Sequence, residues 1–361
     1  MNLIRISKRD DLPKKKEIVI RILAILLSIL FSGVIIMMFG LNPAEIFRSI
    51  IEGAVGTPTR IRQTILTAVP LTITSLGIIV AFKMKFWNIG AEGQITMGAL
   101  GATVIALFLP ESVPAPLKLL LMLLASMLFG GVWAFIPAIF KAKMGTNETI
   151  FTLMLNYIAI KFVTYLQYGP WKDPNSGGFP RIAYYPDNAL LPSLFGVHIG
   201  WIIAIICVAF VYLFINYTKK GYEITVVGES LETARYAGMN ISQIIVTAMF
   251  ISGGMCGVVG MIQAAGIEKT LVAPIANNYG FTAIITAWLS RLNAVACLFV
   301  CIAFAMLTQG GAYIQIALGV PSAVASVVQG TVLFFVLGSE FFLQYRVSLA
   351  RRAAQAKKEV A

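Results

Sequence analysis

Apolar residues along this chain gather into ten runs, separated by shorter stretches that hold most of its polar and charged residues. Each run is near the roughly 20 residues that a helix needs to cross about 30 Å of hydrocarbon. The pattern therefore predicts an all-α polytopic membrane protein with about ten transmembrane helices. We expect them at 18–39, 64–82, 88–109, 117–140, 149–167, 197–217, 241–262, 271–290, 292–310 and 321–343.

The eighth run, 271–290, is interrupted by Pro274, Asn277, Asn278 and Gly280. The uninterrupted remainder is too short to cross a bilayer, and non-helical backbone at membrane depth is tolerated where it is buried in protein or lines a cavity. Dividing the ten spans five and five gives two inverted halves, and "NIGAEG" opens the matching third span of the first half. Interrupted segments at corresponding positions of inverted halves point to a transport path.

Composition and charge agree with a membrane protein. The chain of 361 residues is 58% hydrophobic and only 12% charged, whereas a soluble domain carries about 25% charged residues. Its net charge of +12 could indicate nucleic-acid binding, but 20 of the 28 Lys and Arg residues fall in or beside the terminal segments and alternate loops. This asymmetry is the positive-inside pattern. We therefore expect cytoplasmic tails at 1–17 and 344–361 around a transmembrane domain at 18–343 of a cell-membrane protein.

Two loops are longer than the others. The external loop at 168–196 is rich in prolines, glycines and aromatic residues, which favours an ordered, non-helical cap. The cytoplasmic loop at 218–240 mixes charge with a short helical pattern from Glu229 to Ala237, ended by Gly238 as a C-cap residue. This loop is too small to be an enzyme domain but large enough to be a docking surface. Its candidate docking residues are Glu229, Glu232, Arg235 and Gly238.

The sequence shows no catalytic, metal or cofactor motif. The four cysteines all lie inside apolar runs without a C-x-x-C pair, and His198 is the single histidine. Free cysteine packs as a small hydrophobic residue, and one histidine without matching cysteines does not make a zinc site. Phosphate-loop, zinc-protease and nucleophile-elbow motifs are also missing from the sequence. We therefore expect no cofactor, no metal and no enzyme activity, with energy supplied by another chain or an ion gradient.

Polar residues open the third run, within "FWNIGAEGQITMGALGA" at 86–102. In one interpretation Asn88 caps the helix, Glu92 lies near the favourable N-terminal dipole, and the glycines allow close helix packing. In the other, Asn88, Glu92 and Gln94 line a polar path, because intramembrane polar groups usually face a bundle interior or an aqueous cavity. The two interpretations are compatible, and the sequence leaves both open.

Further candidates lie in two other spans. Asn147 and Glu148 form a capping pattern at the start of the fifth span, and Asn156 and Tyr157 lie two turns deeper. Uncharged amides beside aromatic rings suit a neutral, hydrogen-bonding, partly flat solute, and no arginine cluster indicates a phosphate or carboxylate ligand. The full set of candidate path residues is Asn88, Glu92, Gln94, Asn156, Tyr157, Asn277, Asn278 and Tyr279.

Three stretches in order resemble one family. "FWNIGAEGQITMGALGA" at 86–102, "GTNETIFTLMLNYIA" at 145–159 and "ARYAGMNISQIIVTAMFISGGMCGVVG" at 234–260 are similar to segments of the permease subunits of bacterial ABC importers for nucleosides and simple sugars. These permeases belong to the branched-chain amino-acid permease-like superfamily. The resemblance extends from about residue 18 to 343, and 218–240 resembles the family's coupling loop.

The resemblance implies an importer with two permeases, two ATPases and an extracellular substrate-binding lipoprotein. This chain would be the larger permease of a heterodimer, and the nucleoside branch, with a purine nucleoside as the solute, fits it best. A simple sugar such as a pentose or hexose is the alternative, because sugar permeases share the same signatures. An ion-coupled secondary transporter is a further alternative, although the candidate acids Glu92, Glu148 and Glu340 lie near expected cytoplasmic edges rather than deep in the membrane.

Overall fold

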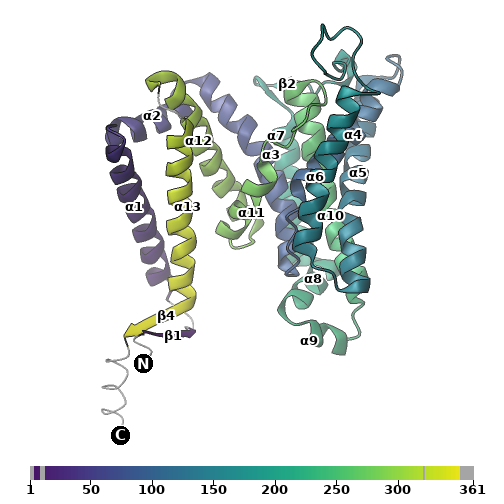
Figure 1. Cartoon of the computed structure of the whole chain (residues 1–361). Helices are drawn as coiled ribbons and strands as arrows, with labels where there is room; N and C mark the ends of the chain where they lie inside the picture. The colour runs from purple at the N-terminus through teal and green to yellow at the C-terminus, as the bar shows by residue number, and fades with distance from the viewer. Residues whose placement is uncertain (1–3, 9–12, 320–321, 350–361) are drawn as a thin grey trace. The chain divides into compact units, whose positions relative to one another are not determined.

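The computed structural model describes residues 4–8, 13–319 and 322–349, which are almost entirely helical (Figure 1). The larger helices are α1 (Lys14–Met38), α2 (Pro43–Val55), α3 (Pro58–Lys83), α4 (Ala91–Phe108), α5 (Ala115–Met144), α6 (Glu148–Tyr168), α7 (Gly200–Tyr217), α8 (Lys219–Glu229), α10 (Ile241–Ile262), α11 (Tyr279–Leu289), α12 (Ala294–Leu318) and α13 (Ser322–Gln344). The short elements are α9 (Leu231–Tyr236), the 3-10 helix η1 (Asp187–Ala189), the π-helix η2 (Gln263–Glu268), and the strands β1 (Ile4–Lys8), β2 (Ser193–Leu194), β3 (Val197–His198) and β4 (Tyr345–Leu349).

Seven helices of the described chain are long and apolar enough to cross a membrane: α3, α4, α5, α6, α7, α10 with η2, and α12. The bent pair α1 and α2 makes an eighth if it is one span. The interrupted eighth run behaves as expected, because its helix α11 has only 11 residues and the chain before it is not helical. A polytopic helical protein is therefore correct, while the number ten and the inverted halves stay predictions. The expected tenth span, 321–343, falls in α13, apart from residue 321, which lies outside the described residues.

The structure contains elements that the apolar pattern did not predict. α2 fills a stretch expected to be a loop, and Asn42 Oδ1 caps it by accepting from the Ala44 N–H at 3.1 Å, with Pro43 at the first turn. The expected loop at 218–240 is mostly helical, since α8 and α9 occupy 219–229 and 231–236. α9 corresponds to the helical pattern expected between Glu229 and Ala237, whereas α8 is short and partly polar and was not expected.

The chain divides into two compact units, one of residues up to Arg60 and from Met306 onward, the other Ile61–Ala305. In the first unit α1 packs against α13 and α2. Its core holds buried aliphatic side chains of Ile36, Ile46, Ile50, Ile314, Val324 and Val328. β1 and β4 pair antiparallel, so residues 4–8 lie beside 345–349 within the expected tails (Figure 1).

The core of the second unit is a close packing of α4, α5 and α10 (Figure 1). Glycines allow this approach: a Cβ on Gly98 of α4 would collide with the Gly257 backbone of α10, and one on Gly257 would collide with the Ser126 carbonyl of α5. Such small-residue contacts let helix backbones come together in lipid, where van der Waals packing drives association. The glycines of the third span therefore have the packing role that the sequence suggested.

The long connection between α6 and α7 is ordered by hydrogen bonds and carries only η1, β2 and β3, as the sequence predicted. Tyr185 Oη shares a 2.6 Å hydrogen bond with Thr103 Oγ1 of α4, and Thr270 Oγ1 donates to the Ile182 carbonyl at 2.9 Å. The buried Lys118 of α5 donates to Asn188 Oδ1 of the connection at 3.3 Å. These contacts fasten the connection to the ends of several helices.

His198, in this connection, predicts a pH dependence of stability. Its Nδ1 accepts from the Gly200 N–H at 3.1 Å, and burial lowers the pKa of the ring from its ordinary 6.5. A depressed folded pKa means that the unfolded chain binds more protons below pH 6.5, so this contribution to stability is present above that pH and is lost as pH falls through the folded pKa. Between pH 7.5 and 5.5 the thermal midpoint should fall further in the wild type than in His198→Asn, whose amide oxygen can still accept from Gly200. Equal falls in both proteins would contradict this assignment.

Candidate functional site

The chain between α3 and α4 leaves the helix and brings polar groups into the second unit. α3 ends at Lys83, residues 84–90 are not helical, and α4 starts at Ala91. The N-cap residue of α4 is Gly90 rather than Asn88, so the expected cap lies two residues too early. Asn88 instead accepts the Gly90 N–H on Oδ1 at 3.0 Å, which holds the turn in front of the helix.

Asn88 and Gln94 form a reciprocal amide pair inside the unit. Asn88 Nδ2 donates to Gln94 Oε1 at 3.1 Å, Gln94 Nε2 donates to Asn88 Oδ1 at 2.9 Å, and Asn88 Nδ2 also donates to Ser252 Oγ of α10 at 3.1 Å. Both amide side chains are buried, at 0% and 1% exposed. Because buried amides are costly unless they are paired, this mutual pairing explains how they are accommodated.

Asn156 performs a similar role from α6. Its Oδ1 accepts from the Gly93 N–H at 2.8 Å, and its Nδ2 donates to the Ile89 carbonyl at 2.8 Å. Thr152, one turn earlier on α6, accepts from the Ile89 N–H on Oγ1 at 3.2 Å. The side chains of α6 thereby complete the hydrogen bonds that the non-helical turn before α4 cannot make by itself.

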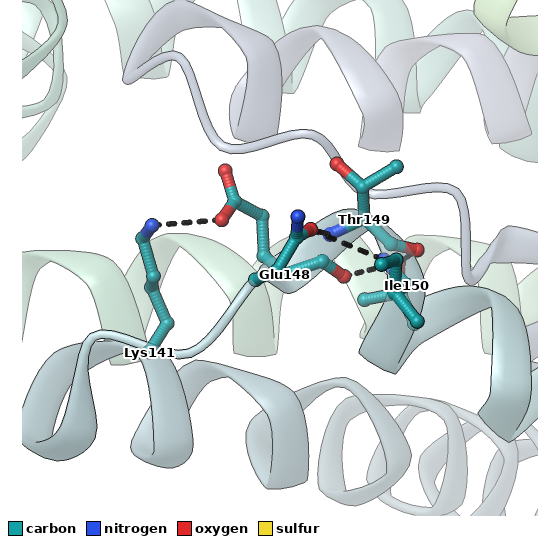
Figure 2. A network of polar contacts seen from close by, with 6 residues as sticks. Lys141, Glu148, Thr149 and Ile150 are labelled. Atoms are coloured by element: carbon teal, nitrogen blue, oxygen red, sulfur yellow. Dashed lines mark hydrogen bonds and ion pairs between the residues drawn. The ribbon is translucent and has the colours of Figure 1, made fainter.

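α6, the helix that carries Asn156, begins with a capped first turn (Figure 2). Asn147 Oδ1 accepts from the N–H groups of Thr149 and Ile150 at 3.0 and 3.3 Å, and Lys141 of α5 forms a 2.8 Å ion pair with Glu148. An acid in the first turn also favours the helix dipole. The capping interpretation of Asn147 and Glu148 is therefore confirmed.

Glu92 connects α4 and α11, the two helices that follow the interrupted segments 86–90 and 270–278. Its Oε1 accepts from the Gly280 N–H, in the first turn of α11, at 2.7 Å. The N–H groups of Phe281 and Asn278 also interact favourably with this carboxylate, which is 3% exposed. A helix N-terminus carries partial positive charge and unpaired N–H groups, so a carboxylate stabilises it. Glu92 of α4 thus caps α11, 188 positions away in sequence.

The remaining candidates lie on the outside of this cluster. Asn277 and Asn278 are exposed and both have left-handed backbones, with φ of 46° and 60°, just before α11. Tyr279 is half-buried, and its hydroxyl lies near Gln263 and Thr67. Tyr157 is 59% exposed, in contrast to its neighbour Asn156. The structure therefore gathers Asn88, Glu92, Gln94 and Asn156 as buried, hydrogen-bonded side chains around the start of α4. Tyr157 is exposed and does not belong to this cluster.

Sequence reasoning missed two hydrogen-bond partners of this cluster, Ser252 and Thr152, and also the buried Gln263. Gln263 begins η2 and is 1% exposed. A glutamine at the end of the apolar run "ISGGMCGVVGMIQAAG" was a signal that could have drawn attention to it. Ser252 and Thr152 gave no such signal, because serine and threonine are frequent in membrane helices and usually bond to their own helix.

α9 is an exposed helix with defined ends. Ser230 Oγ accepts from the Thr233 N–H at 3.2 Å at its start, and Gly238 has a left-handed backbone, φ +72°, just after its end. The Gly238 N–H donates to the Arg235 carbonyl and the Met239 N–H to the Ala234 carbonyl, both at 3.0 Å. This pattern is a Schellman motif, so the expected role of Gly238 as helix terminator is confirmed.

The surface of α9 differs in part from the expectation. Glu232 and Arg235 are exposed on it, as are Leu231 and Tyr236, the latter at 97%. Glu229 instead ends α8, so the helix that was expected to start there begins two residues later. Within the second unit α8 and α9 lie at one end, and β2 lies at the opposite end (Figure 1).

Comparison with known sequences identifies the family. The profile of the family described as branched-chain amino acid transport system / permease component matches residues 60–337, more than half of the chain. The chain belongs to this family. The permease is accordingly a multi-pass transport subunit and not an enzyme, in agreement with the sequence analysis.

The permease has relatives that align over most of their length. It is 34% identical to a glucose ABC transporter permease of Haloferax volcanii, over 91% of this chain and 89% of the relative. It is 28% identical to a nucleoside ABC transporter permease of Lactococcus lactis subsp. cremoris, over 96% and 98%, respectively. A guanosine ABC transporter permease of Bacillus subtilis is 29% identical over 90% and 94%. The expected resemblance to nucleoside and sugar permeases is therefore confirmed.

Proposed function

We propose that this permease forms the path for a nucleoside, and a purine nucleoside in particular, in an ATP-driven importer. The observation that carries this proposal is the near end-to-end correspondence with two relatives named for nucleoside and guanosine transport. A glucose transport relative is similar over a comparable length. A simple sugar is therefore the second candidate solute.

The geometry divides the polar candidates between two roles. Asn88, Gln94 and Asn156 pair within the protein, so we assign them to the frame that supports the broken segment. Asn277 and Asn278 are exposed amides on that segment, and we assign them to contact with the solute. Exposed amides offer both hydrogen-bond donors and acceptors, which suits a neutral solute such as a nucleoside.

Uptake by the assembled complex tests this function. Cells or vesicles with the permease and its partners should import guanosine, and excess unlabelled guanosine should compete better than glucose or ribose. Alanine at Asn277 or Asn278 should lower uptake about five- to 150-fold, because losing a hydrogen bond in a desolvated site costs roughly 1–3 kcal/mol. If a sugar inhibits uptake and nucleosides do not, the transported solute is a sugar and not a nucleoside.

We further propose that α9 docks on a separate ATPase, and that a second permease and an extracellular binding lipoprotein complete the importer. The positive-inside pattern supports a cytoplasmic position for α9 and both termini. The pairing of β1 with β4 supports a common side for the two terminal segments, and the opposite positions of β2 and α9 support opposite sides for residues near 180 and 230. Cysteine labelling from outside should reach residue 180 and not residue 230.

Docking through α9 predicts separate effects on insertion and coupling. Arg235→Glu should leave membrane insertion unchanged but reduce transport-linked ATP hydrolysis at least about tenfold, because an unpaired charge at an interface costs roughly 2–5 kcal/mol. Gly238→Val should weaken coupling as well, since a β-branched residue is strained at φ +72°. Tyr222→Ala, which removes an exposed ring from α8, serves as the control. If Arg235→Glu and Gly238→Val both bind the ATPase and hydrolyse ATP at the wild-type rate, α9 is a solvated connection and not a docking helix.

A further inference from the structure

At its end α10 widens into a π-helix, and a non-helical segment follows. η2 covers Gln263–Glu268 and ends at Lys269, whose backbone is left-handed with φ 57°. The Ala265 carbonyl accepts from the Leu191 N–H at 3.1 Å, so the external connection satisfies one group of this turn. π-helical turns are rare and recur at functional sites, and this one directly precedes the proposed solute-contacting segment.

Gln263 is the unusual side chain of this turn. It is 1% exposed, and neither its Nε2 nor its Oε1 has a hydrogen-bond partner among the described residues. Gln94 is equally buried, but both of its amide atoms are paired with Asn88. A buried amide without partners destabilises the folded state and calls for an explanation.

The surroundings of Gln263 connect it to the broken segment. The Tyr279 hydroxyl approaches the Gln263 carboxamide and the Thr67 side chain of α3, but it does not reach hydrogen-bond geometry with either amide atom of Gln263. Tyr279 is the first residue of α11 and directly follows the exposed pair Asn277 and Asn278. A displacement of this segment would therefore move the Tyr279 hydroxyl away from the Gln263 carboxamide.

We propose that the Gln263 carboxamide binds the transported solute, a nucleobase edge that presents one donor and one acceptor side by side. A carboxamide offers the complementary pair, an N–H donor and a carbonyl acceptor. Gln263 remains covered until the segment before α11 moves, so it meets the solute during passage. This inference rests on the proposed nucleoside transport and adds the residue that recognises the base by hydrogen bonds.

The hypothesis predicts opposite changes in stability and transport for one substitution. In the reconstituted complex, Gln263→Met should raise the thermal midpoint because it removes two unpaired buried polar atoms, yet lower inosine uptake at least about tenfold. The matched control Gln94→Met breaks the pair with Asn88 and should lower the midpoint. Wild-type protein should prefer inosine to 1-methylinosine, which lacks the N–H donor, and Gln263→Met should lose this preference.

Two results would overturn the inference. A Gln263→Met protein with wild-type uptake and wild-type preference shows that the carboxamide does not contact the solute. A fall in its thermal midpoint shows instead that the carboxamide is a paired structural group. Either result leaves nucleoside uptake by the wild type intact. A wild-type complex that imports a sugar and no nucleoside would contradict the proposed function separately, and the proposed reading of a base with it.

Discussion

Gly257→Ala should prevent the second unit from packing, although it adds a single methyl group. The new Cβ would collide with the Ser126 carbonyl oxygen of α5 and would also lie 3.3 Å from the Gly130 Cα. These atoms belong to a neighbouring backbone, which cannot turn aside as a side chain can. Overpacking usually costs about 1–3 kcal/mol, and more where backbones must separate. We expect little or no thermally stable protein.

Gly254→Ala is the matched control, three residues earlier on the same helix. A Cβ at Gly254 would meet only the Met127 carbonyl, at the ordinary contact distance of 3.4 Å. Both variants gain the same helix propensity from alanine, so the difference between them isolates the close contact of α10 with α5. Size-exclusion chromatography after heating should show a wild-type midpoint for Gly254→Ala. A normal midpoint for Gly257→Ala would mean that the helices are not so closely packed.

Glu92→Leu should remove the hydrogen bond between α4 and α11 and strongly reduce transport. Leucine removes the acceptor of the Gly280 N–H and leaves the positive end of α11 without a carboxylate. A hydrogen bond to a charged group contributes about 1.5–3 kcal/mol, which corresponds to roughly a tenfold to 150-fold loss of uptake if α11 must be held in place. The membrane level of the variant should be measured together with uptake.

Glu92→Gln distinguishes the hydrogen bond from the charge. The amide oxygen of glutamine can still accept from Gly280, so this variant should keep more uptake than Glu92→Leu. An Asn277→Cys reporter, placed on the exposed turn before α11, should react faster with a thiol reagent in the leucine variant because that turn is released. Equal labelling and equal uptake in wild type, Glu92→Gln and Glu92→Leu would show that Glu92 does not hold this segment.

Local signals in the sequence predicted several features within a few residues. Long apolar runs located most of the membrane helices, since the thickness of the bilayer sets their length. Pro274, Asn277 and Asn278 marked the break before α11, and Asn147 and Gly238 marked a helix start and a helix end. Each of these signals acts on its own backbone or on the next turn, so neighbouring residues suffice to interpret it. The helices α8 and α2 escaped the same reasoning because they lack a long apolar run.

The pairing of buried polar groups depended on the tertiary structure. Asn88 meets Ser252 across 164 positions, and Glu92 meets Gly280 across 188, while Gln263, no less buried, has no partner among the described residues. No local pattern encodes these differences. They follow from which helices approach one another, and that approach depends on contacts such as Gly98 with Gly257. Whether a buried amide is paired depends on which polar groups of the neighbouring helix lie opposite it. Their positions are determined only when the helices have packed.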